Sequence, residues 1–155
     1  LPEVVWRAGI DISPLDAADD ADRAWLAGLV WPGEVGRAER VLAALDVVAA
    51  DPPLMVAANA LAVLEDVAAL APRGATLVVT TPGVLAHVPY AGRNELIARA
   101  RGLGRWVTID DPTLHQGWTT APTSWREGFA VALDGNIFAA ADPLGGWIDL
   151  DVGAP

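Results

Sequence analysis

The sequence has no cysteine and no lysine, so all ten of its positively charged side chains are arginines. Without cysteine the chain cannot form a thiolate zinc site, an iron–sulfur cluster or a thiol nucleophile. Without lysine it has no Schiff-base lysine, no pyridoxal-phosphate anchor and no P-loop lysine. These absences exclude several classes of enzyme. They say little about the compartment, because many cytosolic proteins have no disulfides.

Several glycine and histidine motifs are also missing. There is no Gly-x-Gly-x-x-Gly phosphate loop, because Gly102-Leu103-Gly104 precedes an expected strand instead of following one. There is no Gly-x-Ser-x-Gly elbow and no His-Glu-x-x-His zinc motif. The two histidines, His87 and His115, are not at metal-ligand spacing, and we predict no metal site. Simple hydrolase and zinc-protease mechanisms are therefore excluded.

Positive charge is scarce, since ten basic side chains stand against twenty acidic ones and the formal net charge is −10. Such a chain repels phosphate backbones and anionic lipid surfaces, so we expect no binding to nucleic acids or membranes. No charge-free apolar run approaches the roughly 18 residues of a membrane span, and residues 1–7 do not resemble a signal peptide. With 53% hydrophobic residues, we expect an acidic, cytoplasmic globular protein with a core of its own.

The hydrophobic pattern alternates between strand-like and helix-like segments. Strands are expected at residues 4–12, 54–58, 75–81 and 106–109, and helices at residues 24–31, 35–49, 61–71 and 94–101. Residues 129–133 and 137–141 flank Asp134-Gly135-Asn136, which is typical of an antiparallel hairpin. Residues 113–126 have no periodicity and are expected to form a functional loop. The order predicts one α/β domain over residues 1–155, with a Rossmann-like, mainly parallel sheet, helices on both faces and a C-terminal antiparallel hairpin.

Polar side chains follow the expected strands at their carboxyl ends, where sheets of this class bind ligands. These residues are Asp11, Asn59, Thr80, Thr81, Asp110 and Asp111. Asp11 has two interpretations. A carboxylate just past a strand can accept hydrogen bonds from both hydroxyls of a ribose, or it can form an Asx turn that leads into Ser13-Pro14. We expect a small-molecule ligand at this edge of the sheet.

The other candidates also have more than one interpretation each. Asn59 contacts the edge of a base or caps the helix that follows it. Asp110 and Asp111 have three interpretations: a base, a turn before Pro112, or a metal site, for which two carboxylates without a histidine or a third acid are poor evidence. His87, which follows the third strand, is a general base or a structural histidine.

Acidic and aromatic residues form two further patterns. The acidic residues between positions 16 and 22 precede an expected helix, so we interpret them as helix caps and solvated charges and not as a cation site. Of the seven tryptophans, Trp6, Trp25 and Trp106 lie in expected regular elements and should be core residues. Trp118 and Trp125 are candidates for ligand contact.

The end of the first expected strand carries a family resemblance. Residues 9–14, GIDISP, resemble the end of the second strand of class I S-adenosylmethionine-dependent methyltransferases. Residues 76–88, TLVVTTPGVLAHV, resemble their fourth strand and the segment after it, and the hairpin resembles their antiparallel sixth and seventh strands. More narrowly, residues 5–11 (VWRAGID), 24–32 (AWLAGLVWP) and 50–53 (ADPP) are similar to the bacterial domain of unknown function 2332 family, whose name carries no activity.

The methyltransferase resemblance implies S-adenosylmethionine as the cofactor. It makes Asp11 the ribose-binding acid and places Asn59 at the adenine, where such enzymes often have an aspartate. The remaining candidates are a cofactor-binding pair, Thr80 and Thr81, and a catalytic pair, His87 and Asp110.

The sequence departs from the methyltransferase pattern at its start. Members of that class have a first strand and a glycine-rich turn upstream of this point, and this chain has neither. In their sheet the first strand is central, because it lies between the second and fourth strands. We therefore expect a C-terminal fragment that is unstable, domain-swapped into a homo-oligomer, or paired with a missing N-terminal segment. Two functions stay open: part of an S-adenosylmethionine-dependent methyltransferase, or a non-catalytic descendant of that fold that serves as a binding or assembly module.

Overall fold

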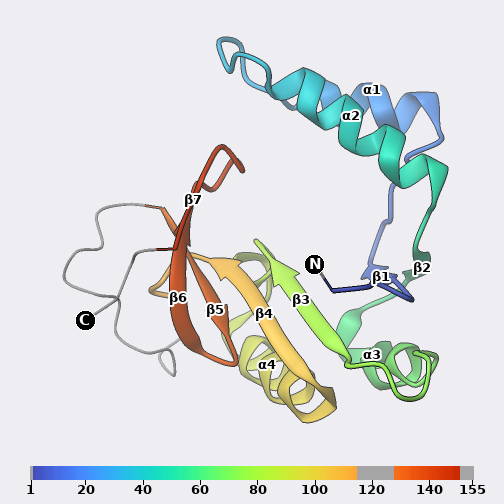
Figure 1. The fold of residues 1–155 in the computed structure, drawn as a ribbon, viewed down its shortest axis with the longest axis vertical. Coiled ribbons are helices and arrows are strands. Elements are labelled where there is room, and N and C mark those ends of the chain that lie inside the picture. The colour runs from blue at the N-terminus through green and yellow to red at the C-terminus, as the bar shows by residue number, and fades with distance from the viewer. Residues whose placement is uncertain (1, 115–127, 151–155) are drawn as a thin grey trace. The chain divides into compact units, whose positions relative to one another are not determined.

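The computed structural model describes residues 2–114 and 128–150 of the 155-residue chain. It divides into two compact units, Leu1–Val63 and Leu64–Pro155, each with a sheet of its own (Figure 1). Both units combine strands with helices, so the prediction of an α/β fold is confirmed. Within the described ranges, no helix is long and apolar enough to cross a membrane.

The first unit contains two parallel strands, β1 (Ala8–Asp11) and β2 (Leu54–Ala57). Their register pairs Asp11 with Ala57, so both strands end at the same edge. The backbone N–H of Ala58 donates to the carbonyl oxygen of Asp11 at 2.9 Å, which extends the pairing by one step. Both strands lie within the ranges expected from the sequence, although β1 is shorter than predicted.

Two helices form the crossover that parallel strands require. They are α1 (Asp20–Gly28) and α2 (Arg37–Ala50), and they pack against each other. The carboxylate of Asp19 caps α1 by accepting the backbone N–H groups of Ala21 and Asp22 at 2.9 and 3.0 Å. The interpretation of the acidic cluster as a helix cap is therefore confirmed.

The first unit buries few apolar side chains. Among its described residues, Ala17 alone is a buried hydrophobic residue, whereas Trp25, Trp31 and Val35 are 62%, 75% and 94% exposed. The prediction that Trp25 belongs to a core is wrong, because its position on α1 leaves most of the ring in solvent. Since stabilisation scales with the apolar area removed from water, this unit gains little from its own packing.

The second unit contains a five-stranded sheet of order β3-β4-β5-β6-β7. The strands are β3 (Val78–Pro82), β4 (Arg105–Asp110), β5 (Phe129–Leu133), β6 (Asn136–Ala141) and β7 (Ile148–Asp149). Strands β3 and β4 are parallel, and the other three neighbouring pairs are antiparallel. The prediction of a mainly parallel sheet is therefore wrong for this unit.

The β5–β6 turn explains part of this difference. Asp134 and Gly135 both have positive φ angles, 51° and 87°, which reverse the chain so that β5 and β6 pair antiparallel. The hairpin was expected from the sequence and is confirmed. Strand β7 was not expected, and its pairing with β6 adds a further antiparallel neighbour.

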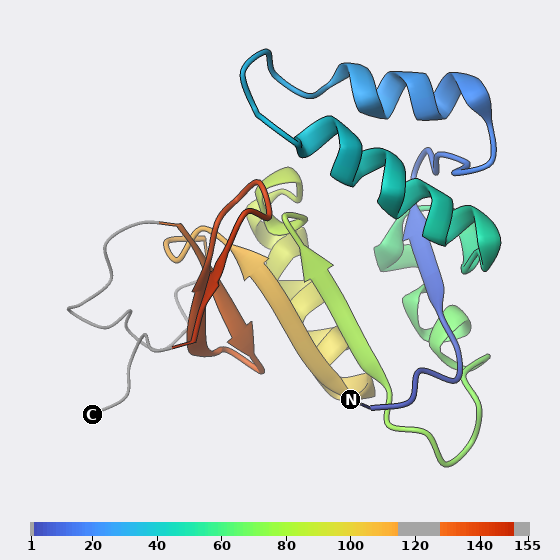
Figure 2. The same ribbon diagram turned by 45° about the horizontal axis from the view of Figure 1, so that its top comes forward.

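The core of the second unit lies between its sheet and α4 (Tyr90–Leu103), which runs along β3 and β4 (Figure 2). Helix α3 (Ala60–Ala68) leads into this unit, and a short 3₁₀ helix, η1 (Leu85–His87), connects β3 to α4. The core cluster consists of Leu85, Ile97, Ala100, Trp106 and Ala130. Trp106 is fully buried, as predicted, and its indole N–H donates to Thr81 Oγ1 at 3.0 Å.

We expect Trp106→Ala to destabilise the second unit by about 3–5 kcal/mol, the usual cost of removing a buried aromatic ring. The matched control is Phe138→Ala in the same sheet, where the ring is 45% exposed and the loss should be less than half as large. Hydrogen exchange of the β4 amides measures both variants within this unit. Equal losses in the two variants would contradict the assignment of Trp106 to the core.

Candidate functional site

Two of the predicted ligand-binding residues lie together in the first unit. Asp11 ends β1, and Asn59 follows the end of β2 by two residues. Because the register pairs Asp11 with Ala57, the two polar residues come from neighbouring strands at one edge. Both are exposed.

Local hydrogen bonds hold these two side chains. Asp11 Oδ1 accepts the backbone N–H of Ser13 at 2.8 Å, which is the Asx turn that the sequence offered as one interpretation. Asn59 Oδ1 accepts the N–H of Leu61 at 2.9 Å and so caps α3. Both structural interpretations are confirmed. They are compatible with the ligand interpretations, which stay predictions.

The other predicted site residues belong to the second unit. Thr80 and Thr81 are consecutive on β3, so their side chains point to opposite faces of the sheet. Thr80 is exposed, whereas Thr81 is 5% exposed and accepts the indole N–H of Trp106. His87 ends η1 and is exposed.

Asp110 is a buried acid at the end of β4, with 1% of its surface exposed. Its Oδ2 lies 2.8 Å from Thr108 Oγ1, and Thr108 Oγ1 also lies 3.0 Å from the carbonyl oxygen of Thr81. Burial raises the pKa of the Asp110 carboxyl. Hydrogen bonds from Thr108 and from the Leu85 backbone, and the charges of Arg93 and His87, oppose this rise without cancelling it.

The Thr108 hydroxyl has a single proton for its two neighbours. When Asp110 is protonated, its O–H can donate to Thr108 Oγ1, and the Thr108 hydroxyl can then donate to the carbonyl of Thr81. This chain satisfies all three groups without a buried negative charge. The geometry therefore agrees with the raised pKa of Asp110.

Sequence reasoning missed two residues around Asp110. Thr108 bonds the acid directly, and the alternation of 106, 108 and 110 on one face of β4 was the signal that could have revealed it. Arg93 on α4 donates to the carbonyl oxygens of Leu114 and Val88 at 2.9 and 3.2 Å. Its Nε is buried and has no hydrogen-bond partner within residues 2–114 and 128–150.

Asp111 differs from its neighbour Asp110. It is exposed, and its Oδ1 accepts the backbone N–H of Thr113 at 2.8 Å and the Thr113 hydroxyl at 2.6 Å. These bonds lower the pKa of Asp111 and confirm the turn that the sequence offered for it. In the described part of the chain, no three acidic, histidine or cysteine side chains come together as metal ligands. His115, Trp118 and Trp125 lie outside the described residues.

These features define an α/β protein with exposed polar groups at the end of one parallel strand pair and a buried acid at the end of another. The chain belongs to the bacterial family described as "Uncharacterized protein conserved in bacteria (DUF2332)", which it matches over residues 1–149. The family similarity expected from the sequence is therefore confirmed. Neither a curated protein nor a solved structure matches the chain, and no comparison identifies a methyltransferase.

We expect Asp110→Asn to change the pH dependence of stability. The native state holds the Asp110 proton more tightly than the unfolded chain, whose carboxyl titrates near its ordinary value of 3.8. The wild-type protein therefore loses stability as the pH rises from that value through the raised folded-state pKa. Asparagine does not titrate, so the variant should gain stability relative to wild type across this window. Urea unfolding between about pH 3 and 7 at constant ionic strength measures the difference.

Asp111→Asn is the control, and its stability relative to wild type should change with pH in the opposite direction. The pKa of Asp111 is lower in the folded state than in the unfolded chain. The ionised Asp111 carboxylate therefore stabilises the fold at pH values above the unfolded-state pKa, and this stabilisation is lost as the pH falls through the folded-state pKa. This variant should therefore lose stability relative to wild type as the pH rises. The same pH trend in both variants would contradict the assignment for Asp110.

Proposed function

We propose that the first unit binds the nucleoside part of S-adenosylmethionine and that the protein is a methyltransferase-like enzyme of Rossmann-like ancestry. The observation that carries the proposal is the register of β1 and β2, which brings Asp11 and Asn59 to one edge. Ligands bind beyond the carboxyl ends of parallel strands in sheets of this class. Both side chains are exposed and so are accessible to a ligand.

The two side chains have the chemistry that a nucleoside requires. One oxygen of Asp11 accepts the Ser13 N–H, and a carboxylate has further lone pairs for two ribose hydroxyls. Asn59 uses Oδ1 to cap α3, and its NH₂ group can donate to an acceptor nitrogen of adenine. The formal net charge of −10 also favours a cofactor with a positive sulfonium.

The methyl transfer itself needs alignment of the nucleophile with the methyl group and, for some acceptors, a base. His87 is exposed and stays a candidate base, but it belongs to the second unit and forms no part of the proposed nucleoside site. Asp110 is buried in the same unit as His87, so its carboxyl is not accessible for direct contact with an acceptor. Thr80 is exposed and Thr81 is buried against Trp106, and both belong to the second unit and not to the proposed nucleoside site.

One observation favours the alternative, a non-catalytic binding or assembly module. The first unit exposes large apolar side chains, among them Trp25, Trp31 and Val35. Large contiguous apolar patches that are exposed on a soluble protein mark surfaces that contact other proteins. The module needs no bound cofactor, and a cofactor titration therefore separates the two functions.

The test is calorimetric titration of S-adenosylhomocysteine into the purified protein as its gene encodes it. We expect micromolar binding to the wild-type protein, weakened by roughly 1–3 kcal/mol in Asp11→Ala through the loss of charge-assisted hydrogen bonds. Asp11→Asn keeps an acceptor oxygen for the Ser13 N–H and so preserves the Asx turn. A loss of affinity in this variant therefore comes from the ligand contact and not from disruption of the turn. Asp66→Asn on α3 is the matched control, because it removes one exposed acidic charge elsewhere.

Weaker binding in both Asp11 variants, with Asp66→Asn unchanged, would support the proposal. Unchanged affinity in both Asp11 variants would remove Asp11 from the site. No binding by a protein that circular dichroism shows to be folded would leave the binding or assembly module as the function.

A further inference from the structure

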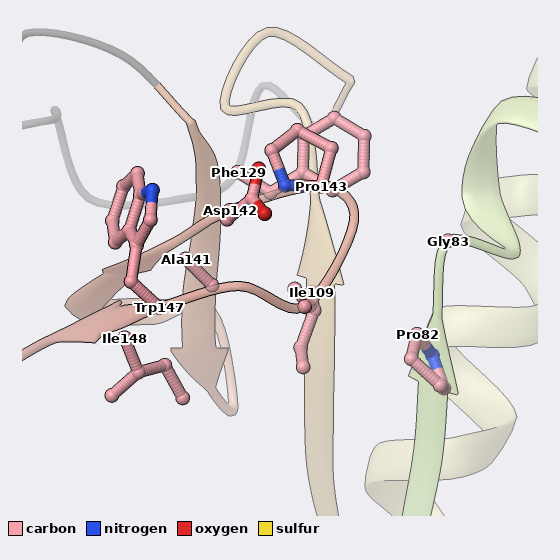
Figure 3. Close-up of a pocket in the computed structure, with 10 residues that line it drawn as sticks. Pro82, Gly83, Ile109, Phe129, Ala141, Asp142, Pro143, Trp147 and Ile148 are labelled. Carbon is pink, nitrogen blue, oxygen red and sulfur yellow. The ribbon is translucent and has the colours of Figure 1, made fainter. Parts of the chain in front are cut away.

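A cavity of about 440 Å³ lies at the carboxyl end of the parallel pair β3 and β4. Its walls come from the ends of β3 and β4, the start of β5, and the turn between β6 and β7 (Figure 3). The lining residues that carry the argument are Pro82, Ile109, Phe129, Asp142, Pro143 and Trp147. None of them is a site residue predicted from the sequence, and all belong to the second unit.

The cavity is separate from the buried acid described above. Ile109 lies between Thr108 and Asp110 on β4, so its side chain points to the opposite face of the sheet. Ile109 packs against a cluster of Val131, Ala139 and Ala141, and not against the core under α4. The volume is within the range of about 300–1,000 Å³ that is typical of small-molecule sites.

Most of the described lining residues are apolar, and Asp142 is the charged side chain among them. The turn fixes this carboxylate, because Asp142 Oδ2 accepts the N–H of Gly146 at 2.8 Å. The Asp142 N–H donates to the carbonyl oxygen of Trp147 at 3.0 Å, and the N–H of Gly145 donates to the Asp142 carbonyl at 2.9 Å. A carboxylate has acceptor capacity beyond one hydrogen bond, so Asp142 can still bind a ligand.

The chemistry of the lining selects a cation. Two aromatic residues, Phe129 and Trp147, line the same cavity as the carboxylate. Aromatic faces attract ammonium groups, and a carboxylate attracts them through its charge. Among the lining residues that the structure describes there is no arginine to pair with a phosphate or a carboxylate ligand.

We propose that this cavity binds a small organic cation, namely an ammonium group attached to an apolar or aromatic body. The ammonium group lies against Asp142 and the aromatic rings, and the body fills the space along Pro82, Ile109 and Pro143. The inference does not depend on the proposed cofactor site, because Asp11 and Asn59 belong to the first unit.

The test compares two probes of the same shape. Benzyltrimethylammonium carries the charge, and neopentylbenzene replaces its nitrogen by carbon. We expect the cation to bind at least about tenfold more tightly than the neutral probe, as carboxylate and aromatic contacts with a partly desolvated ammonium predict. The amide and indole shifts of Trp147 in two-dimensional NMR spectra report the binding directly.

Asp142→Asn should remove most of the tenfold preference and leave the neutral probe unchanged. This variant keeps an acceptor oxygen for the Gly146 N–H, so the turn is preserved. Asp66→Asn, which removes an exposed charge from α3, should leave both affinities unchanged. Phe129→Leu should weaken the cation more than the neutral probe.

Three results would overturn the proposal. The first is equal binding of the two probes. The second is a preference for the cation that persists in Asp142→Asn. The third is the absence of shift changes at Trp147 at millimolar concentrations of benzyltrimethylammonium, in a protein whose spectrum shows it to be folded.

Discussion

The structure of the second unit depends on the way β4 buries every other side chain. Trp106, Thr108 and Asp110 point to the face that α4 covers, and none is more than 1% exposed. The Trp106 backbone N–H donates to Asp134 in the β5–β6 turn, and its indole N–H donates to Thr81 on β3. Buried polar groups are costly unless they are paired, so these bonds hold three strands in one arrangement. The Asp110 carboxyl, 2.8 Å from Thr108 Oγ1, belongs to the same set of bonds.

The first unit is held by a different kind of interaction. Two parallel strands alone are marginal in water, and this unit has almost no buried apolar side chain to support them. Its polar bonds include the Asp19 cap of α1, the Asn59 cap of α3 and the ion pair between Arg23 on α1 and Asp46 on α2 at 2.6 Å. The two units therefore differ in the acid at the end of a parallel strand. Asp11 is exposed at the end of β1, whereas Asp110 is buried at the end of β4.

Features encoded by neighbouring residues were predictable from the sequence. The Asp134-Gly135 turn, the cap at Asp19 and the Asx turn at Asp11 each involve residues a few positions apart, so their signals are local. Strand pairing was less predictable, because the periodicity of apolar residues predicts where a strand lies but not which strand it pairs with. Strand β7 has two residues and carries no period. The partners of Asp110 depend on contacts across the fold, although the alternation along β4 indicated Thr108.

The Asx turn at Asp11 has a consequence for molecular recognition. A flexible surface carboxylate must give up rotational freedom when a ligand fixes it, at a cost of about 0.5–1.5 kcal/mol for a rotamer-rich side chain. The bond from the Ser13 N–H already restricts the Asp11 side chain. Part of that entropy is therefore lost during folding. A partner that meets this carboxylate finds it preorganised, and less of the interaction energy is spent on ordering it.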